Sequence, residues 1–141
     1  MTQRTNVLLV DDDLTVRQSL EQVLTLENFR VVPVSNGHEA LREFGEKHID
    51  IVLLDLNLGE ESGWDTFDKL KRIRPFLPVI IMTGSPEHCP KISADRAEGF
   101  MEKPLDLTML FRKLNDLAAK AAELRSVKTS PPLVDSGALS A

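Results

Sequence analysis

Apolar residues gather in five short runs along the chain, and the stretches between most of them carry apolar residues at helical spacing. The runs cover residues 6–10, 30–34, 50–55, 78–83 and 99–102. Runs rich in Val, Ile and Leu are typical of strands buried on both faces of a parallel sheet. The run at 30–34 contains Pro33, which has no N–H for a sheet ladder, so we expect this strand at an edge of the sheet.

Four segments show the apolar spacing of helices. The predicted helices cover residues 14–27, a short stretch between the turn at 35–37 and about 45–48, the stretch from Trp64 to Pro75, and a long segment from Leu107 to about Leu124. Asp13 is expected to cap the first of these helices. The third helix is expected to bury one face, formed by Trp64, Phe67, Leu70 and Ile73.

Three regions lack a regular pattern. Residues 56–62 are expected to form a polar loop, because they include Asn57, Gly59 and several polar or acidic residues. Residues 84–98 contain two prolines and mixed charges, and we expect only a helix of about two turns that begins at Pro90. The tail beyond Leu124 is rich in Ser, Pro and Gly and is expected to be flexible.

Strands that alternate with helices predict an α/β fold, a doubly wound five-stranded parallel sheet in one domain. A length of 141 residues fits a single core. The formal net charge of -5, without a dense Lys/Arg block, argues against direct binding of nucleic acid or of anionic membranes. No apolar run has the length of a membrane span or follows the pattern of a signal peptide, so we expect a cytoplasmic protein. Cys89 is the only cysteine, which excludes an intrachain disulfide.

Polar side chains follow four of the predicted strands: Asp11 and Asp12, then Asp55, Thr83 and Lys103. We expect them to lie close together, because the carboxyl ends of parallel strands share one edge of a sheet, where ligands bind. Clustered carboxylates repel one another unless a hard divalent cation such as Mg²⁺ lies between them. A lysine and a hydroxyl beside that cation suit an incoming phosphoryl group, which leaves Asp55 as the carboxylate that attacks phosphorus.

Each of these residues also has a simpler explanation. Asp12 and Asp13 could both serve only to cap the first helix, and for Asp13 this explanation is favoured. Thr83 could be an ordinary strand end and Lys103 a surface cation. Their joint placement with Asp55 favours a functional site.

The order and spacing of these residues resemble the receiver domain of two-component response regulators, over about residues 5–124. The matching positions are Asp11, Asp12, Asp55, Gly63, Thr83 and the pair Lys103-Pro104. The resemblance implies a flavodoxin-like (βα)5 fold with strand order 2-1-3-4-5. We therefore divide the chain into a lead-in over 1–5, a receiver domain over 6–124 and a flexible tail over 125–141.

The same resemblance implies a role for each site residue. The Mg²⁺ ligands would be Asp11, Asp12, Asp55 and the backbone carbonyl of Asn57. Asp55 would be the phosphoacceptor, and Thr83 and Lys103 would contact the phosphoryl group. Thr83 would also take part in the switch between conformations.

Phe100 matches the position of an aromatic switch residue in this family, and core packing explains it equally well. The Lys103-Pro104 peptide bond would be cis, a form accessible to X-Pro bonds. Two features depart from the family pattern. Gly59 stands where a proline is usual, which loosens the loop that carries Asn57. Between Thr83 and Lys103 the chain is about two residues shorter than is usual.

The expected function is that of a stand-alone response regulator receiver, a phosphoprotein of a two-component phosphorelay. It would accept a phosphoryl group from a sensor histidine kinase or a histidine phosphotransfer protein onto Asp55 and signal to an unknown downstream protein. It would catalyse this transfer and its own dephosphorylation without turning over a free substrate. An alternative is a pseudoreceiver, an interaction module that acts without phosphorylation. A Mg²⁺-dependent phosphohydrolase would need an acid two residues after Asp55, where Asn57 stands.

Overall fold

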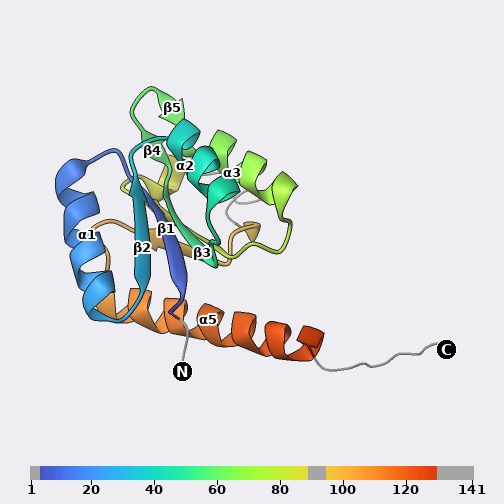
Figure 1. Ribbon diagram of the computed structural model, residues 1–141. Helices are drawn as coiled ribbons and strands as arrows, with labels where there is room; N and C mark the ends of the chain where they lie inside the picture. The colour runs from blue at the N-terminus through green and yellow to red at the C-terminus, as the bar shows by residue number, and fades with distance from the viewer. Residues whose placement is uncertain (1–3, 89–94, 130–141) are drawn as a thin grey trace.

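The computed structural model describes residues 4–88 and 95–129, and Figure 1 shows their arrangement. Within these residues one parallel sheet has the order β2-β1-β3-β6-β7. Its strands are β1 (Asn6–Val10), β2 (Arg30–Val34), β3 (Ile51–Asp55), β6 (Val79–Thr83) and β7 (Gly99–Glu102). Counted along the chain, these strands have the order 2-1-3-4-5, which confirms the predicted fold. Strand β2, with Pro33, is an edge strand as expected.

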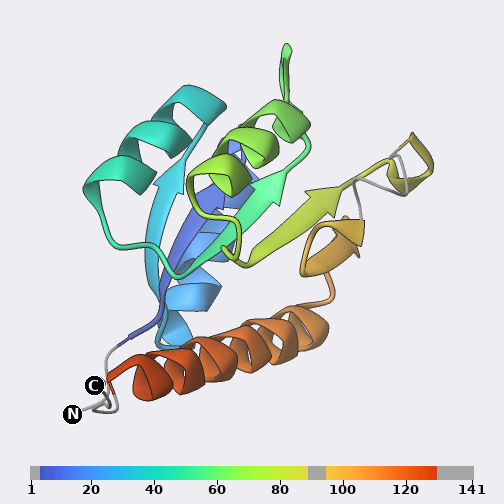
Figure 2. The same cartoon turned by 90° about the vertical axis from the view of Figure 1, so that its right-hand side faces the viewer.

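Helices cover both faces of the sheet. They are α1 (Leu14–Leu26), α2 (Gly37–Glu46), α3 (Gly63–Ile73) and α5 (Leu107–Thr129), with the short 3-10 helix η1 (Pro86–His88) after β6. Figure 2 shows α2 and α3 on one face and α1 and α5 on the other. Helix α5 continues past Leu124, where we expected the tail to begin. Cys89 and most of the helix expected from Pro90 lie outside the described residues.

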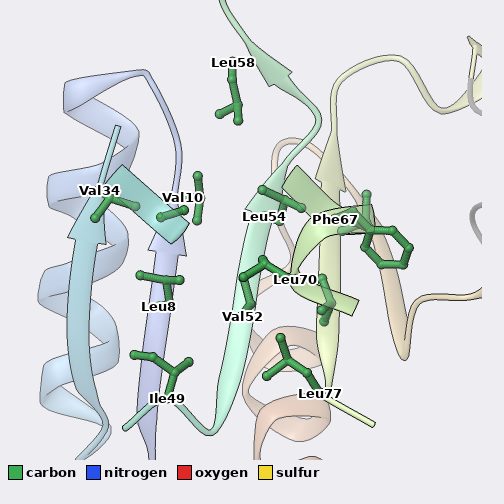
Figure 3. Packing of buried hydrophobic residues seen from close by; sticks show 13 residues of the cluster. Leu8, Val10, Val34, Ile49, Val52, Leu54, Leu58, Phe67, Leu70 and Leu77 are labelled. Carbon is green, nitrogen blue, oxygen red and sulfur yellow. The ribbon is translucent and has the colours of Figure 1, made fainter. Parts of the chain in front are cut away.

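The alternation of side chains along the strands divides the core into two layers. Leu8, Val52 and Ile81 contribute to the layer under α2 and α3, much of which is drawn in Figure 3. Their neighbours in the sequence face α1 and α5. Every residue of β3 and of β6 is buried. This explains why both strands are apolar along their whole length except at their last residues, Asp55 and Thr83. None of the helices in the described part of the chain has the length and apolarity that a membrane crossing requires.

Helix α3 buries a narrower face than the sequence pattern suggested. Phe67 and Leu70 are fully buried and Trp64 is half-buried, but Ile73 is 63% exposed. The expectation for Ile73 was wrong because a step of three residues turns a helix by only about 300°. Repeated steps of three therefore drift around the helix, and the fourth member of the series no longer faces the sheet.

The stretch from 56 to 62, which we expected to be a loop, contains a small antiparallel hairpin. Strands β4 (Asn57–Leu58) and β5 (Glu61–Ser62) pair with each other, and Gly59 adopts a φ of 73° at the turn between them. Two-residue strands are too short to show a period in the sequence, so the pattern could not predict them. Leu58 is buried in the core, which anchors the hairpin to the domain.

Replacing Phe67 by alanine should lower the free energy of unfolding by about 3–5 kcal/mol, because the change leaves a cavity in the core. Phe67 is fully buried and forms an edge-to-face pair with Trp64. Urea denaturation followed by circular dichroism measures the loss. The matched control is Phe76→Ala, since Phe76 is 91% exposed, and its effect should stay within about 0.5 kcal/mol. Equal losses in the two variants would contradict the described packing.

Candidate functional site

The strand register brings the acidic residues together at the carboxyl edge of the sheet. Val10 of β1 pairs with Leu54 of β3, so the next residues along, Asp11 and Asp55, lie side by side. Asp11 is fully buried and Asp55 nearly so. Buried carboxylates need a partner to remain charged, since removing them from water is costly. The edge of the sheet therefore holds two buried acids that need compensation.

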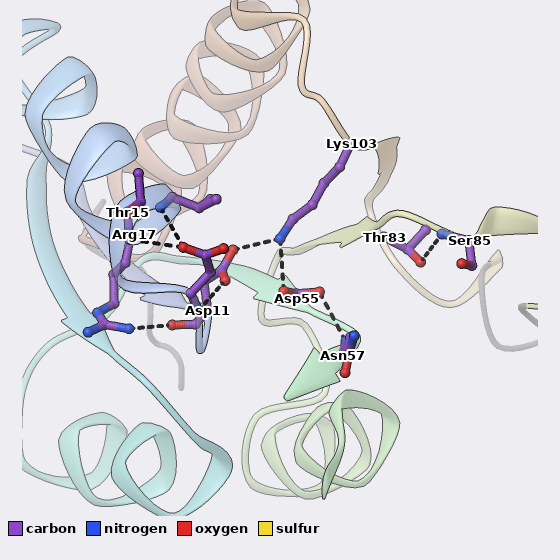
Figure 4. A network of polar contacts seen from close by, with 10 residues as sticks. Asp11, Thr15, Arg17, Asp55, Asn57, Thr83, Ser85 and Lys103 are labelled. Carbon is purple, nitrogen blue, oxygen red and sulfur yellow. Dashed lines mark hydrogen bonds and ion pairs between the residues drawn. The ribbon is translucent and has the colours of Figure 1, made fainter. Parts of the chain in front are cut away.

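Lys103 supplies that compensation from the loop after β7 (Figure 4). Its Nζ lies 2.9 Å from Oδ2 of Asp11 and 2.9 Å from Oδ2 of Asp55. These are charge-assisted hydrogen bonds, which are stronger than neutral ones. One ammonium group thus joins residues that lie far apart in the sequence, as predicted from the strand ends.

The pKa values of Asp55 and Lys103 are both raised in this environment. Burial raises the pKa of Asp55, and the nearby charge of Asp11 adds to the rise, while hydrogen bonds from Lys103 and from the Asn57 N–H oppose it. Burial alone would lower the pKa of Lys103, but the hydrogen bonds to Asp11 and Asp55 outweigh it and the pKa is raised. Lys103 is therefore held as a cation.

Asp12 adds a third carboxylate to the group. Of the acidic residues that the structure describes, Asp11, Asp12 and Asp55 each offer a carboxylate oxygen, and these oxygens lie within 4.8 Å of one another. The oxygen ligands of one Mg²⁺ ion, each about 2.1 Å from it, lie roughly 3–4 Å apart. With three carboxylates and one lysine in the group, the donor set fits a hard divalent cation. Asp12 is exposed, so its side chain is accessible to solvent and ions.

Backbone contacts fix Asp11 further. The N–H of Asp13 donates to Oδ1 of Asp11 at 3.0 Å, and the Asp13 side chain caps α1, as expected. Arg17 of α1 donates from Nη1 to the carbonyl oxygen of Asp11 at 2.7 Å. The contact made by Arg17 could not be predicted from the sequence, because a spacing of six residues between an acid and an arginine matches no local motif.

The loop after β3 is shaped by close backbone approaches. The N–H of Asn57 donates to Oδ1 of Asp55 at 3.0 Å. At Gly63, a Cβ atom would lie 2.5 Å from the carbonyl oxygen of Asp55, so only glycine fits there. At Gly59, a Cβ atom would lie 3.6 Å from Oδ2 of Asp12, which places the hairpin turn beside the acidic group. Coordination by the Asn57 carbonyl stays a prediction.

Thr83 lies at the end of β6, next to the strand that carries Asp55. Its hydroxyl oxygen accepts a hydrogen bond from the N–H of Ser85 at 3.0 Å, and its carbonyl accepts from the N–H of Lys103 at 2.8 Å (Figure 4). Thr83 thus positions the backbone of Lys103. The hydrogen bonds described for its hydroxyl do not include one to Asp55, so a phosphoryl contact stays a prediction.

Phe100 and the peptide bond before Pro104 complete the predicted set. Phe100 is half-buried on β7, opposite Ile81, and packs against the core layer under α2 and α3. The packing accounts for its aromatic ring, and a switching role stays a prediction. The Lys103-Pro104 bond is cis.

Comparisons with known proteins agree with this geometry. The model of the response regulator receiver domain family matches residues 7–115. The transcriptional regulatory protein GlrR of Escherichia coli (strain K12) is 32% identical over 119 residues, which are 83% of this chain and 27% of that protein. The chain thus spans about a quarter of the length of this relative.

Two solved structures of the response regulator protein TrrA from Thermotoga maritima are also similar, each at 25% identity. One, in complex with Mg²⁺ and BeF, has a TM-score of 0.74 and covers 80% of this chain and 98% of TrrA. The other, in complex with the histidine kinase ThkA, has a TM-score of 0.73 and covers 80% of this chain and 97% of TrrA. On the strength of the family match, the site and the fold, this chain belongs to the response regulator receiver domain family.

Proposed function

We propose that this protein is a cytoplasmic, phosphorylatable receiver. It accepts a phosphoryl group onto Asp55 from the phosphohistidine of a sensor kinase or of a phosphotransfer protein. It then changes conformation and signals by contact with another protein, without itself binding nucleic acid. The observation that carries the proposal is the sharing of Lys103 between Asp11 and Asp55, beside the exposed carboxylate of Asp12.

The proposed reaction is a transfer between nitrogen and oxygen. A carboxylate oxygen of ionised Asp55 attacks phosphorus, and a P–O bond forms as the P–N bond of the phosphohistidine breaks. The electron pair of that bond stays on the imidazole nitrogen. Lys103 already contacts Oδ2 of Asp55, so its charge lies where phosphoryl oxygens would gather. Mg²⁺, held by the three carboxylates, would supply further positive charge to these oxygens.

The surface beside Lys103 offers an approach for the phosphodonor. An apolar groove of about 510 Å³ lies between α1 and the start of α5. Val16, Leu20 and Leu105 line it together with Lys103. Because Lys103 also contacts Asp55, a donor side chain placed over this groove lies close to the phosphoacceptor. The kinase complex of the related protein TrrA supports a donor of this class.

Other observations bear on the wider role of the protein. The relative from Escherichia coli is named a transcriptional regulatory protein, which is compatible with a signalling role in the control of transcription. Asn57 stands two residues after Asp55 and has no titratable group, which disfavours a phosphohydrolase. The pseudoreceiver remains the alternative that the following experiments test.

Incubation with acetyl phosphate and Mg²⁺ should add ~80 Da to the protein, and Asp55→Asn should abolish this gain because an amide is not a nucleophile toward phosphorus. Intact mass spectrometry reads the result directly. The control Asp116→Asn removes an exposed carboxylate on α5 and should be labelled like the parent. Undiminished labelling of Asp55→Asn would refute Asp55 as the phosphoacceptor.

Replacing Asp12 by asparagine should raise the dissociation constant for Mg²⁺ at least about tenfold, since it removes one of few carboxylate ligands. Acetyl phosphate labelling should fall with it. Isothermal titration calorimetry measures Mg²⁺ binding by the parent and by the variant. Asp65→Asn removes the same charge from the exposed first turn of α3 and serves as the control. Tight Mg²⁺ binding by Asp12→Asn would show that the acidic group is not the metal site.

Beryllofluoride, as a stand-in for the phosphoryl group, should change amide hydrogen exchange near Thr83 and in β7 while α1 and α2 change little. The reason is that new negative charge beside Lys103 draws the Thr83 hydroxyl away from Ser85, and Phe100 repacks behind it. Exchange is compared with and without beryllofluoride over residues 83–88 and 95–102. Identical exchange in both states would favour the pseudoreceiver.

A further inference from the structure

Along the chain, the β4–β5 hairpin connects β3, the strand that carries Asp55, to α3. It carries Asn57, whose N–H contacts Asp55, and its turn at Gly59 lies beside Asp12. Gly59 has a φ of 73° at this turn, and a glycine gives the turn little stiffness of its own. A pair of two-residue strands is also too short to be stable alone. The buried Leu58 fixes β4 to the core, and a further contact is needed to hold β5 in place.

Glu61 of β5 makes a contact that reaches outside the hairpin. Its Oε1 accepts a hydrogen bond from the N–H of Gly37 at 3.0 Å. Gly37 is the first residue of α2, and its N–H is one of the donors that a helix leaves without an internal partner. The positive end of the helix dipole also favours a carboxylate at this position. Both effects attract Glu61 to the start of α2, near which Figure 1 draws β5.

The start of α2 is a firm anchor for this contact. The Asn36 side chain accepts from the N–H of Glu39, and the Glu39 carboxylate accepts from the N–H of Ser35, so the first turn is capped in both directions. Gly37 is buried, and a Cβ atom there would collide with the Thr66 side chain of α3. The helix end is therefore held on two sides, and the hairpin is tied to a part of the fold that does not move easily.

We propose that Glu61 is a positioning residue for the phosphorylation site. By tying β5 to α2 it holds the hairpin against the acidic group, so that Asn57 and the turn at Gly59 stay next to Asp55 and Asp12. The role rests on the proposed function, because it concerns the binding of Mg²⁺ and the phosphoryl group at that site. Glu61 itself acts through the hairpin and contacts neither.

Three variants separate the hydrogen bond from the charge. Glu61→Ala removes both, while Glu61→Gln removes the charge and keeps an oxygen that accepts from Gly37. Glu60→Ala removes the same charge from the exposed hairpin turn next to it. The binding of MgCl2 by each protein is measured by isothermal titration calorimetry. Amide exchange of residues 56–62 is then measured in metal-free protein, which reports on the hairpin without any activity.

Glu61→Ala should raise the dissociation constant for Mg²⁺ about threefold to tenfold and speed exchange in the hairpin, as expected for the loss of one hydrogen bond made by an exposed side chain. Glu61→Gln should recover most of both effects, and Glu60→Ala should show only a small charge effect on Mg²⁺. If Glu61→Ala matches Glu60→Ala in both measurements, the proposal is wrong. If the parent protein fails to bind Mg²⁺, the proposed function fails, and the metal-free exchange still decides whether Glu61 holds the hairpin.

Discussion

The site depends on one ammonium group placed between two buried carboxylates. Asp11 and Asp55 end adjacent strands, and the parallel register forces them together whatever the cost of their repulsion. Lys103 offsets this cost with two hydrogen bonds of 2.9 Å, and it can do so only because β7 ends at the same edge. The parallel arrangement that brings the two carboxylates together therefore also brings Lys103 to them. A third carboxylate, from Asp12, leaves the group with excess negative charge, which a divalent cation would balance.

Most of the fold could be predicted because its strands are buried on both faces and so read as unbroken apolar runs. The positions of Asp11, Asp55 and Lys103 followed from the rule that parallel strands end at one edge. The contacts made by Arg17 and Glu61 could not be predicted in this way. Each joins a side chain to a backbone group of another element, and neither leaves a periodic trace in the sequence. The periodicity of a sequence predicts which face of an element a residue occupies. It does not predict hydrogen bonds between a side chain and the backbone of another element.

The stretch after β6 shows the same limit. The sequence of residues 84–98 predicted only a short helix and no further fixed point, but the end of this stretch at Glu98 is held by polar contacts. Oε1 of Glu98 accepts from the N–H of Val79 at 2.9 Å and from Nζ of Lys71 at 3.0 Å. Lys71 is itself largely buried and donates to the carbonyl of Leu77 at 2.7 Å. The start of β7 is thus fastened at the sheet edge opposite the site by a partly buried ion pair.

These contacts differ in strength, so the Thr83 hydroxyl can move more easily than Lys103 or Glu98. Among the described residues, the Thr83 hydroxyl is held by one neutral hydrogen bond, from the N–H of Ser85. Exchanging such a bond for another costs about 0.5–1.5 kcal/mol at most. Displacing Lys103 or Glu98 would leave buried charged groups, the carboxylates of Asp11 and Asp55 or the ammonium of Lys71, without their partner and would cost several times as much. A phosphoryl group on Asp55 would therefore act first on Thr83. Because the start of β7 is fixed, we expect the response at the carboxyl ends of β6 and β7.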